Sequence, residues 1–148
     1  MTDDDAALPP DDPYARPPGV DDATVEATAK LSEALEWVER ARGHLYEFHQ
    51  LMGHADLLLD EVVEGLRAAG LDDEAALVAD ELIGRNVLQG RWTFQIVDEF
   101  DETYWGPFCE VERGIRDRRV AGRRHVFEAE MKEERRTEGH PHHARRPD

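Results

Sequence analysis

The chain has 148 residues, 40% of them hydrophobic, which is enough for one domain with a single core. Its formal net charge of −16 would repel a phosphate backbone, so we expect no nucleic-acid partner. No apolar run reaches the length of about 18 residues that a membrane-spanning helix needs. The single cysteine, Cys109, allows no internal disulfide, and the chain opens on aspartates instead of a basic, apolar leader. The sequence therefore predicts a cytoplasmic protein without a membrane partner.

Residues 1–22 contain five prolines among aspartates and offer little apolar area to bury. This composition is typical of a disordered, self-repelling segment. Residues 138–148, EGHPHHARRPD, have a similar character. We therefore predict a folded region over residues 23–137 between two disordered tails.

The first predicted helix, residues 24–69, has the clearest pattern in the chain. From Val38 onward its apolar residues recur in alternating steps of three and four, as in a coiled-coil seam. Gly70 is expected to end the helix. The apolar positions are Leu31, Leu35, Val38, Ala41, Leu45, Phe48, Met52, Ala55, Leu59, Val62, Leu66 and Ala69.

A second helix is predicted over residues 73–103, because acidic residues open it and two apolar stripes follow. A helix that is apolar on two sides has neighbours on two sides, so this should be the middle helix. A turn at residues 104–107 would lead into a third helix over residues 107–136, with Pro107 at its first position. The sequence thus predicts an all-α, antiparallel bundle of three long helices, a long hairpin plus a third helix.

The sequence lacks the glycine-rich phosphate loop, the G-x-S-x-G elbow, the H-E-x-x-H motif and the paired CxxC motifs. Ferritin-like metal bundles need Glu-x-x-His on two helices, whereas this chain has only the reversed His125-x-x-Glu128. We therefore predict no catalytic residue and no cofactor, and we favour a non-enzymatic protein. His140, His142 and His143 are weak candidates for binding a transition metal, and a solvated polar tail is the preferred interpretation.

Polar side chains interrupt the apolar stripes at one height of the predicted bundle. When the hairpin is laid out antiparallel, Met52 falls opposite Gln89 and Leu45 opposite Ile96. The polar residues then converge on a single layer across the three helices. The candidate polar layer comprises His49, Asp56, Arg85, Asn86, Gln89, Trp92, Arg118 and Arg119.

Two interpretations of the candidate polar layer remain open. In the structural one, Asp56 pairs with Arg85, His49 bonds to Gln89 or Asn86, and the layer fixes the register between helices. In the functional one, the layer lines a pocket for a small anionic ligand or a metal.

One further prediction concerns Arg118 and Arg119. Both occupy a seam position of the third helix, so at least one guanidinium should be buried on Trp92 or against a carboxylate.

The first turns of the first helix have little opposite them in a monomer, which leaves Leu31 and Leu35 as interface candidates. We therefore expect a homodimer that completes a four- or six-helix assembly, or binding to another helical protein. The leading functional hypothesis is a non-enzymatic protein–protein interaction or scaffold module. The alternative is a bundle that binds a small anionic ligand or a metal.

Overall fold

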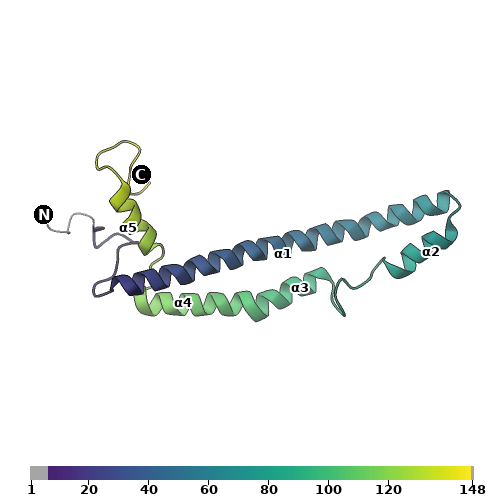
Figure 1. The fold of residues 1–148 in the computed structure, drawn as a ribbon, viewed down its shortest axis with the longest axis horizontal. Coiled ribbons are helices and arrows are strands. Elements are labelled where there is room, and N and C mark those ends of the chain that lie inside the picture. The colour runs from purple at the N-terminus through teal and green to yellow at the C-terminus, as the bar shows by residue number, and fades with distance from the viewer. Residues whose placement is uncertain (1–6, 148) are drawn as a thin grey trace. The chain divides into compact units, whose positions relative to one another are not determined.

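The computed structural model describes residues 7–147, and this part of the chain is helical apart from its loops and one isolated β-bridge. None of the helices in the described range is long and apolar enough to cross a membrane. Figure 1 shows their order along the chain. The elements are α1 (Asp22–Ala68), α2 (Asp72–Glu81), α3 (Thr93–Phe100), the π-helical η1 (Asp101–Trp105), α4 (Gly106–Val120) and α5 (Val126–Arg135).

Helix α1 is 47 residues long, and both of its ends have a local cause. At the start, the carboxylate of Asp21 accepts a hydrogen bond from the backbone N–H of Thr24 at 2.8 Å. At the end, Gly70 adopts a φ of +76°. The N–H of Leu71 then reaches the carbonyl of Leu66 at 2.9 Å, which satisfies one of the last carbonyls of the helix.

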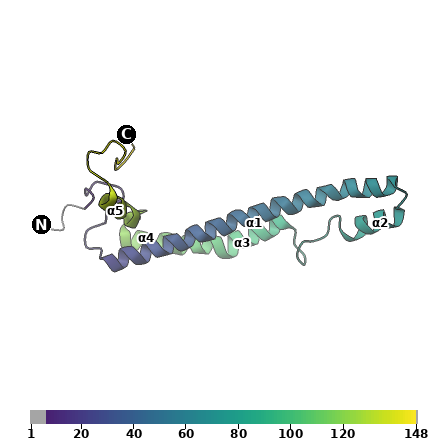
Figure 2. The same ribbon diagram turned by 45° about the horizontal axis from the view of Figure 1, so that its top comes forward.

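The chain divides into two compact units, and α1 contributes to both. The first unit combines the residues up to Glu36 with those from Phe108 onward, and the second is Trp37–Pro107. In the second unit, His49 meets Thr93 and Arg42 meets Asp101, so α1 and the returning chain run antiparallel. Figures 1 and 2 show α2 and α3 following α1 in this way. The buried side chains of this unit are Val63, Ala75, Thr93 and Val97.

The predicted second helix is interrupted by a loop between α2 and α3. Gly84 and Gly90 both have positive φ, at 75° and 71°, and Leu88 forms an antiparallel bridge with Arg91. Glycine adopts this conformation at little cost, so the two glycines are natural breaking points. The prediction of one helix over residues 73–103 was wrong. The helical spacing of apolar residues in the sequence continues through residues 82–92, but the chain forms a loop there.

The turn predicted at residues 104–107 is also absent, since α3, η1 and α4 follow one another without a break. The N–H of Gly106 bonds to the carbonyl of Asp101, five residues back, which is the wider π-helical spacing. This wider turn accommodates Pro107, which lacks an N–H and crowds a regular helix. A Cβ on Gly106 would lie 2.9 Å from the Asp101 oxygen, so the close approach requires glycine.

The predicted third helix breaks between α4 and α5. Ala121, Gly122 and His125 all have positive φ, between 53° and 71°. The Arg116 guanidinium donates to the carbonyl of Gly122 at 2.6 Å and so ties the break to the preceding helix. The single helix expected over residues 107–136 is therefore two helices. The structure therefore has one long helix, α1, and several shorter helices, where three long helices were predicted.

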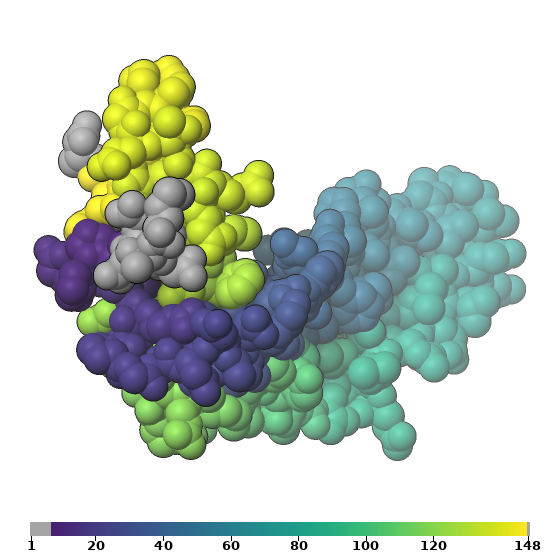
Figure 3. All heavy atoms as spheres, turned by 60° about the vertical axis from the view of Figure 1, so that its left-hand side comes forward, coloured from purple at the N-terminus to yellow at the C-terminus, as the bar shows by residue number. Residues whose placement is uncertain are grey.

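The N-terminal segment packs in the structure, in contrast to the disordered tail predicted for residues 1–22. Asp12 and Ala15 are buried, and the Arg16 guanidinium makes two hydrogen bonds to Glu130 of α5, at 2.8 and 2.9 Å. Figure 3 shows this segment, in purple, against the yellow C-terminal part. Residues 1–6 of the predicted tail lie outside the described residues.

The C-terminal segment also makes ordered contacts, although residues 138–148 were predicted to be disordered. Arg145 makes two hydrogen bonds to Glu133 of α5, at 2.7 and 3.0 Å. Arg136 binds the same carboxylate, with both distances at 2.6 Å. Arg145 therefore holds the C-terminal segment on α5 through charged groups, although its composition is typical of a solvated tail.

Leu31 and Leu35 are half-buried, so the exposed seam expected at the start of α1 is absent. Between them, Ser32 donates a hydrogen bond at 3.0 Å to the buried carboxylate of Glu112 in α4. Arg116, one turn further along α4, pairs with the same carboxylate at 3.0 Å. The first turns of α1 therefore have a neighbour within their own unit, and these two leucines are not an open interface.

Candidate functional site

Exposed side chains, apolar except for His44, form a continuous stripe along the part of α1 that belongs to the second unit. The stripe advances by alternating steps of four and three residues, which is the spacing of a coiled-coil seam. Every member is exposed, and Trp37 and Leu51 are 61% and 60% exposed. We call this the α1 stripe: Trp37, Ala41, His44, Phe48, Leu51, Ala55, Leu58 and Val62.

The α1 stripe is distinct from the surface that α1 turns toward its own hairpin. Within this unit, every second position of the predicted seam is half-buried: Val38, Leu45, Met52, Leu59 and Leu66. The seam positions between them are exposed and belong to the α1 stripe: Ala41, Phe48, Ala55 and Val62. The apolar face of α1 is therefore wider than the rest of the unit covers.

Three consecutive leucines show how the helix divides its surface. Leu59 is half-buried, Leu58 is 44% exposed within the α1 stripe, and Leu57 is 68% exposed. Successive residues are about 100° apart on a helix, so the three side chains leave the axis in different directions. Leu57 consequently offers a control position that is apolar and exposed but lies outside the stripe.

Charged and titratable side chains border the α1 stripe on one side. Four exposed residues follow one another at seven-residue intervals: Arg40, Glu47, His54 and Glu61. The Arg40 guanidinium lies 4.7 Å from the Trp37 ring centroid, a cation–π geometry. Glu47 approaches the His44 ring at 3.5 Å. This border carries both signs of charge, so it provides groups that could select one alignment of a partner helix.

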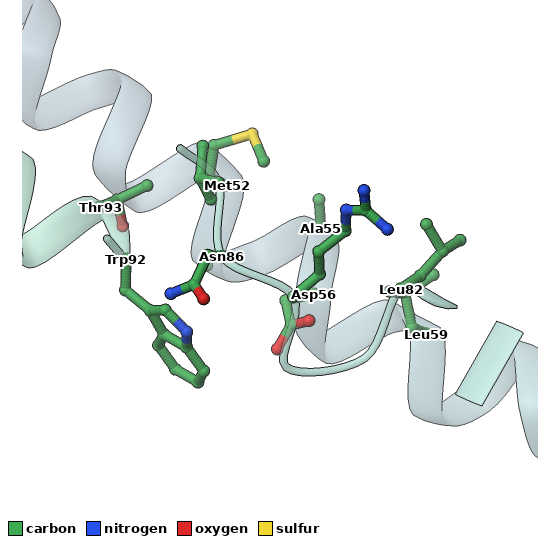
Figure 4. Close-up of a pocket in the computed structure, with 11 residues that line it drawn as sticks. Met52, Ala55, Asp56, Leu59, Leu82, Asn86, Trp92 and Thr93 are labelled. Atoms are coloured by element: carbon green, nitrogen blue, oxygen red, sulfur yellow. The ribbon is translucent and has the colours of Figure 1, made fainter. Parts of the chain in front are cut away.

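A cavity of about 380 Å³ lies between α1 and the loop that joins α2 to α3. Apolar groups make up most of its lining, as Figure 4 shows for Met52, Ala55, Leu59 and Leu82. The polar members include Asp56 from α1 and Asn86 from the loop, and Trp92 also lines the cavity. A volume of this size is typical of small-molecule sites.

The structure brings only part of the candidate polar layer together. Asp56, Arg85, Asn86 and Trp92 all line the cavity. The expected Asp56–Arg85 pair is absent, and the Asp56 carboxylate instead accepts a long 3.4 Å hydrogen bond from the Gly84 N–H. Arg85 turns instead to Glu81, whose carboxylate lies 3.4 Å away.

The remaining members of the layer lie elsewhere. His49 contacts the Thr93 hydroxyl at 2.6 Å and not the predicted Gln89 or Asn86. Gln89 is exposed in the loop. Arg118 and Arg119 are both exposed in the last turn of α4, so the predicted burial of one guanidinium was wrong. The helix ends directly after them, so the seam that was expected to bury them does not continue.

Sequence reasoning missed a half-buried cluster around Arg42. Its guanidinium makes two hydrogen bonds to Asp101, at 2.8 and 3.0 Å, and lies 3.9 Å from the Trp105 ring centroid. The Trp105 indole N–H donates to Glu39 at 3.0 Å. The hydrogen bond from Arg42 lowers the pKa of Asp101 below its ordinary 3.8. Every polar group in the cluster has a partner, so we interpret it as a structural clamp between α1 and η1.

The C-terminal histidines were weak candidates for a metal site. The rings of His140 and His143 lie 4.0 Å apart, and those of His140 and His142 lie 5.8 Å apart. The Nδ1 atoms of His140 and His143 each accept a backbone N–H. Across residues 7–147, no group of three or more histidine, cysteine, aspartate or glutamate side chains is placed to hold a metal ion.

The α1 stripe and the adjoining cavity are therefore two candidate sites of the second unit. Ala55 belongs to both, so the cavity opens beside the stripe. Comparisons with protein-family models, with curated proteins and with solved structures found no match to this chain.

Proposed function

We propose that this protein is a non-enzymatic helical interaction module that self-associates through the α1 stripe. The observation that supports the proposal is a seam of coiled-coil spacing that stays exposed along α1. Two hairpins joined along their stripes would form an assembly with helix-bundle packing, in which exposed apolar groups become core.

The size of the α1 stripe fits a dimer interface. From Trp37 to Val62 it spans roughly 38 Å, at about 1.5 Å per residue. Its large apolar side chains leave on the order of 500 Å² exposed, compared with the roughly 800 Å² that each partner buries in a stable interface. Burial of the alanines and of the bordering stems would supply much of the remainder.

An antiparallel pairing of two copies matches side chains of complementary size. With the two-fold axis between residues 49 and 50, positions whose numbers add up to about 99 lie level with each other. Trp37 then lies level with Val62 of the second copy, and Ala41 with Leu58. The arrangement has no pair of bulky aromatic rings at one level.

The same alignment also matches charges along the border of the stripe. Arg40 comes level with Glu61 of the second copy, and Glu47 with His54. Symmetry repeats each pair, so the interface gains up to four favourable contacts. In a parallel alignment the borders of the two copies would lie on opposite sides of the interface, so none of these pairs would form. This difference favours a second, antiparallel copy as the occupant of the stripe.

Sedimentation velocity on the full chain tests the proposal. We expect the wild type to be a dimer at tens of micromolar and the double variant Leu51→Glu with Leu58→Glu to be a helical monomer. Each substitution would bury a carboxylate in the interface, which strongly disfavours association.

Leu57→Glu is the matched control, because it makes the same chemical change one residue away and outside the stripe. It should leave the dimer intact, and circular dichroism should show unchanged helix content in both variants. A monomeric wild type would contradict the proposal, as would a Leu57→Glu variant that dissociates as readily as the double variant.

A further inference from the structure

We propose that the cavity between α1 and the α2–α3 loop binds a small amphiphilic organic cation, with its ammonium group on Asp56 and its apolar body against Trp92. This site adjoins the α1 stripe and shares Ala55 with it, but the argument for it does not rest on self-association. The argument rests on the lining of the cavity, the poorly satisfied carboxylate of Asp56 and the position of Trp92.

The cavity offers a largely apolar volume with few polar groups. Its volume of about 380 Å³ is lined by Met52 and Leu59 on the α1 side and by Leu82 and Val87 on the loop side. Apolar walls of this kind bind hydrocarbon or aromatic groups through the hydrophobic effect. A few polar groups then determine which ligands are accepted.

Asp56 is the polar group with unused binding capacity. Its carboxylate is half-buried and accepts one hydrogen bond, a long one of 3.4 Å from the N–H of Gly84. Within residues 7–147, no basic side chain forms an ion pair with it. A carboxylate has about four acceptor positions, so an ammonium group is the natural complement for those that remain.

Trp92 and Asn86 add groups that suit the same ligand. Figure 4 shows the side chains of Asp56, Asn86 and Trp92 extending to the same side of the view. The Trp92 indole is 46% exposed, so its face is available to an aromatic ring or a cation. The Asn86 amide can accept a further N–H from the ligand.

The charge of the cavity argues against the anionic ligand considered from the sequence. Arg85 also lines the cavity, and its guanidinium makes long contacts of 3.3 and 3.4 Å with the carbonyl and carboxylate of Glu81, which partly offset its charge. An anion would also meet the carboxylate of Asp56 in the same cavity. Like charges repel strongly in a partly apolar site, so a cation is favoured.

The test compares three probes with the same apolar body: 4-phenylbutylammonium, 4-phenylbutanol and 4-phenylbutanoate. Binding to the full chain would be followed by isothermal titration calorimetry and by the indole N–H resonances in NMR spectra. We expect the ammonium to bind at least tenfold more tightly than the alcohol, the carboxylate to bind most weakly, and the Trp92 resonance to shift.

Two variants locate the charge preference. Asp56→Asn keeps an acceptor for the Gly84 N–H and should reduce the preference for ammonium over alcohol to about twofold or less. Arg85→Gln, on the opposite charge in the same cavity, should leave the preference in place. Equal binding of the three probes, no detectable binding of the ammonium, or an unchanged preference in Asp56→Asn would each overturn the proposal.

Discussion

Glu133 is one of the residues that hold the C-terminal segment on the fold. Its side chain is 8% exposed and binds two guanidinium groups at once, those of Arg145 and Arg136. Hydrogen bonds from Arg145 and then Arg136 lower its pKa from 4.5 to about 2. Because the folded-state pKa is lowered, the resulting stability is present above pH 4.5 and is lost as the pH falls toward 2.

Arg145→Ala should raise the pKa of Glu133 back toward 4.5, because Arg136 alone would then stabilise the charged form. The loss of stability on acidification should correspondingly become smaller over the range from pH 4.5 to 2. NMR titration of the Glu133 carboxyl carbon measures the pKa directly. A wild-type value near 4.5 would show that the C-terminal segment does not dock on α5 in solution.

The candidate polar layer shows how far single residues could be assigned from the sequence. Antiparallel counting put Asp56 level with residues 84–86, and in the structure the Gly84 N–H lies 3.4 Å from the Asp56 carboxylate. It gave the wrong partners, because it assumed a helical backbone where the chain forms a loop. Arg85 therefore points to Glu81 and leaves Asp56 facing the cavity.

At the scale of the elements, periodicity predicted helices well and their interruptions poorly. The start and end of α1 fall within two residues of the predicted 24–69. Gly84, Gly90 and Gly122 lie inside stretches whose apolar spacing is helical, so spacing alone gives no sign of their positive φ. At Pro107 the sequence predicted an interruption that the structure lacks, because a π-helical turn keeps the chain helical there.

Two glycine substitutions, one at the π-helical turn and one in the open surface of α1, should change the stability in opposite directions. Gly106→Ala should destabilise the protein by about 1–2 kcal/mol, because its Cβ would press on the Asp101 carbonyl. Gly43→Ala in α1 has nothing within 4 Å of the added Cβ and should stabilise it by about 0.5–1 kcal/mol. Thermal melts followed by circular dichroism compare the two, and equal effects would refute the requirement for glycine at position 106.

At the scale of the whole molecule, the net charge of −16 opposes any self-association. A dimer must therefore gain enough from apolar burial and from local charge pairing to exceed this repulsion. In the antiparallel alignment, Arg40 and His54 are the basic groups that meet acidic ones across the α1 stripe. Moderate salt would screen the general repulsion and these exposed pairs alike, so salt dependence alone does not identify the alignment.

A charge-reversal cycle on Arg40 and Glu61, read out as dimer dissociation constants by sedimentation equilibrium, tests the antiparallel stripe most directly. Arg40→Glu alone and Glu61→Arg alone should each weaken the dimer by about three- to tenfold, since exposed ion pairs contribute roughly 0.2–1 kcal/mol and each occurs twice. The double variant restores opposite charges at each level and should recover most of the wild-type affinity. The account would be contradicted if the double variant lost as much dimer affinity as the two single variants together. A wild type that remains monomeric would also contradict it.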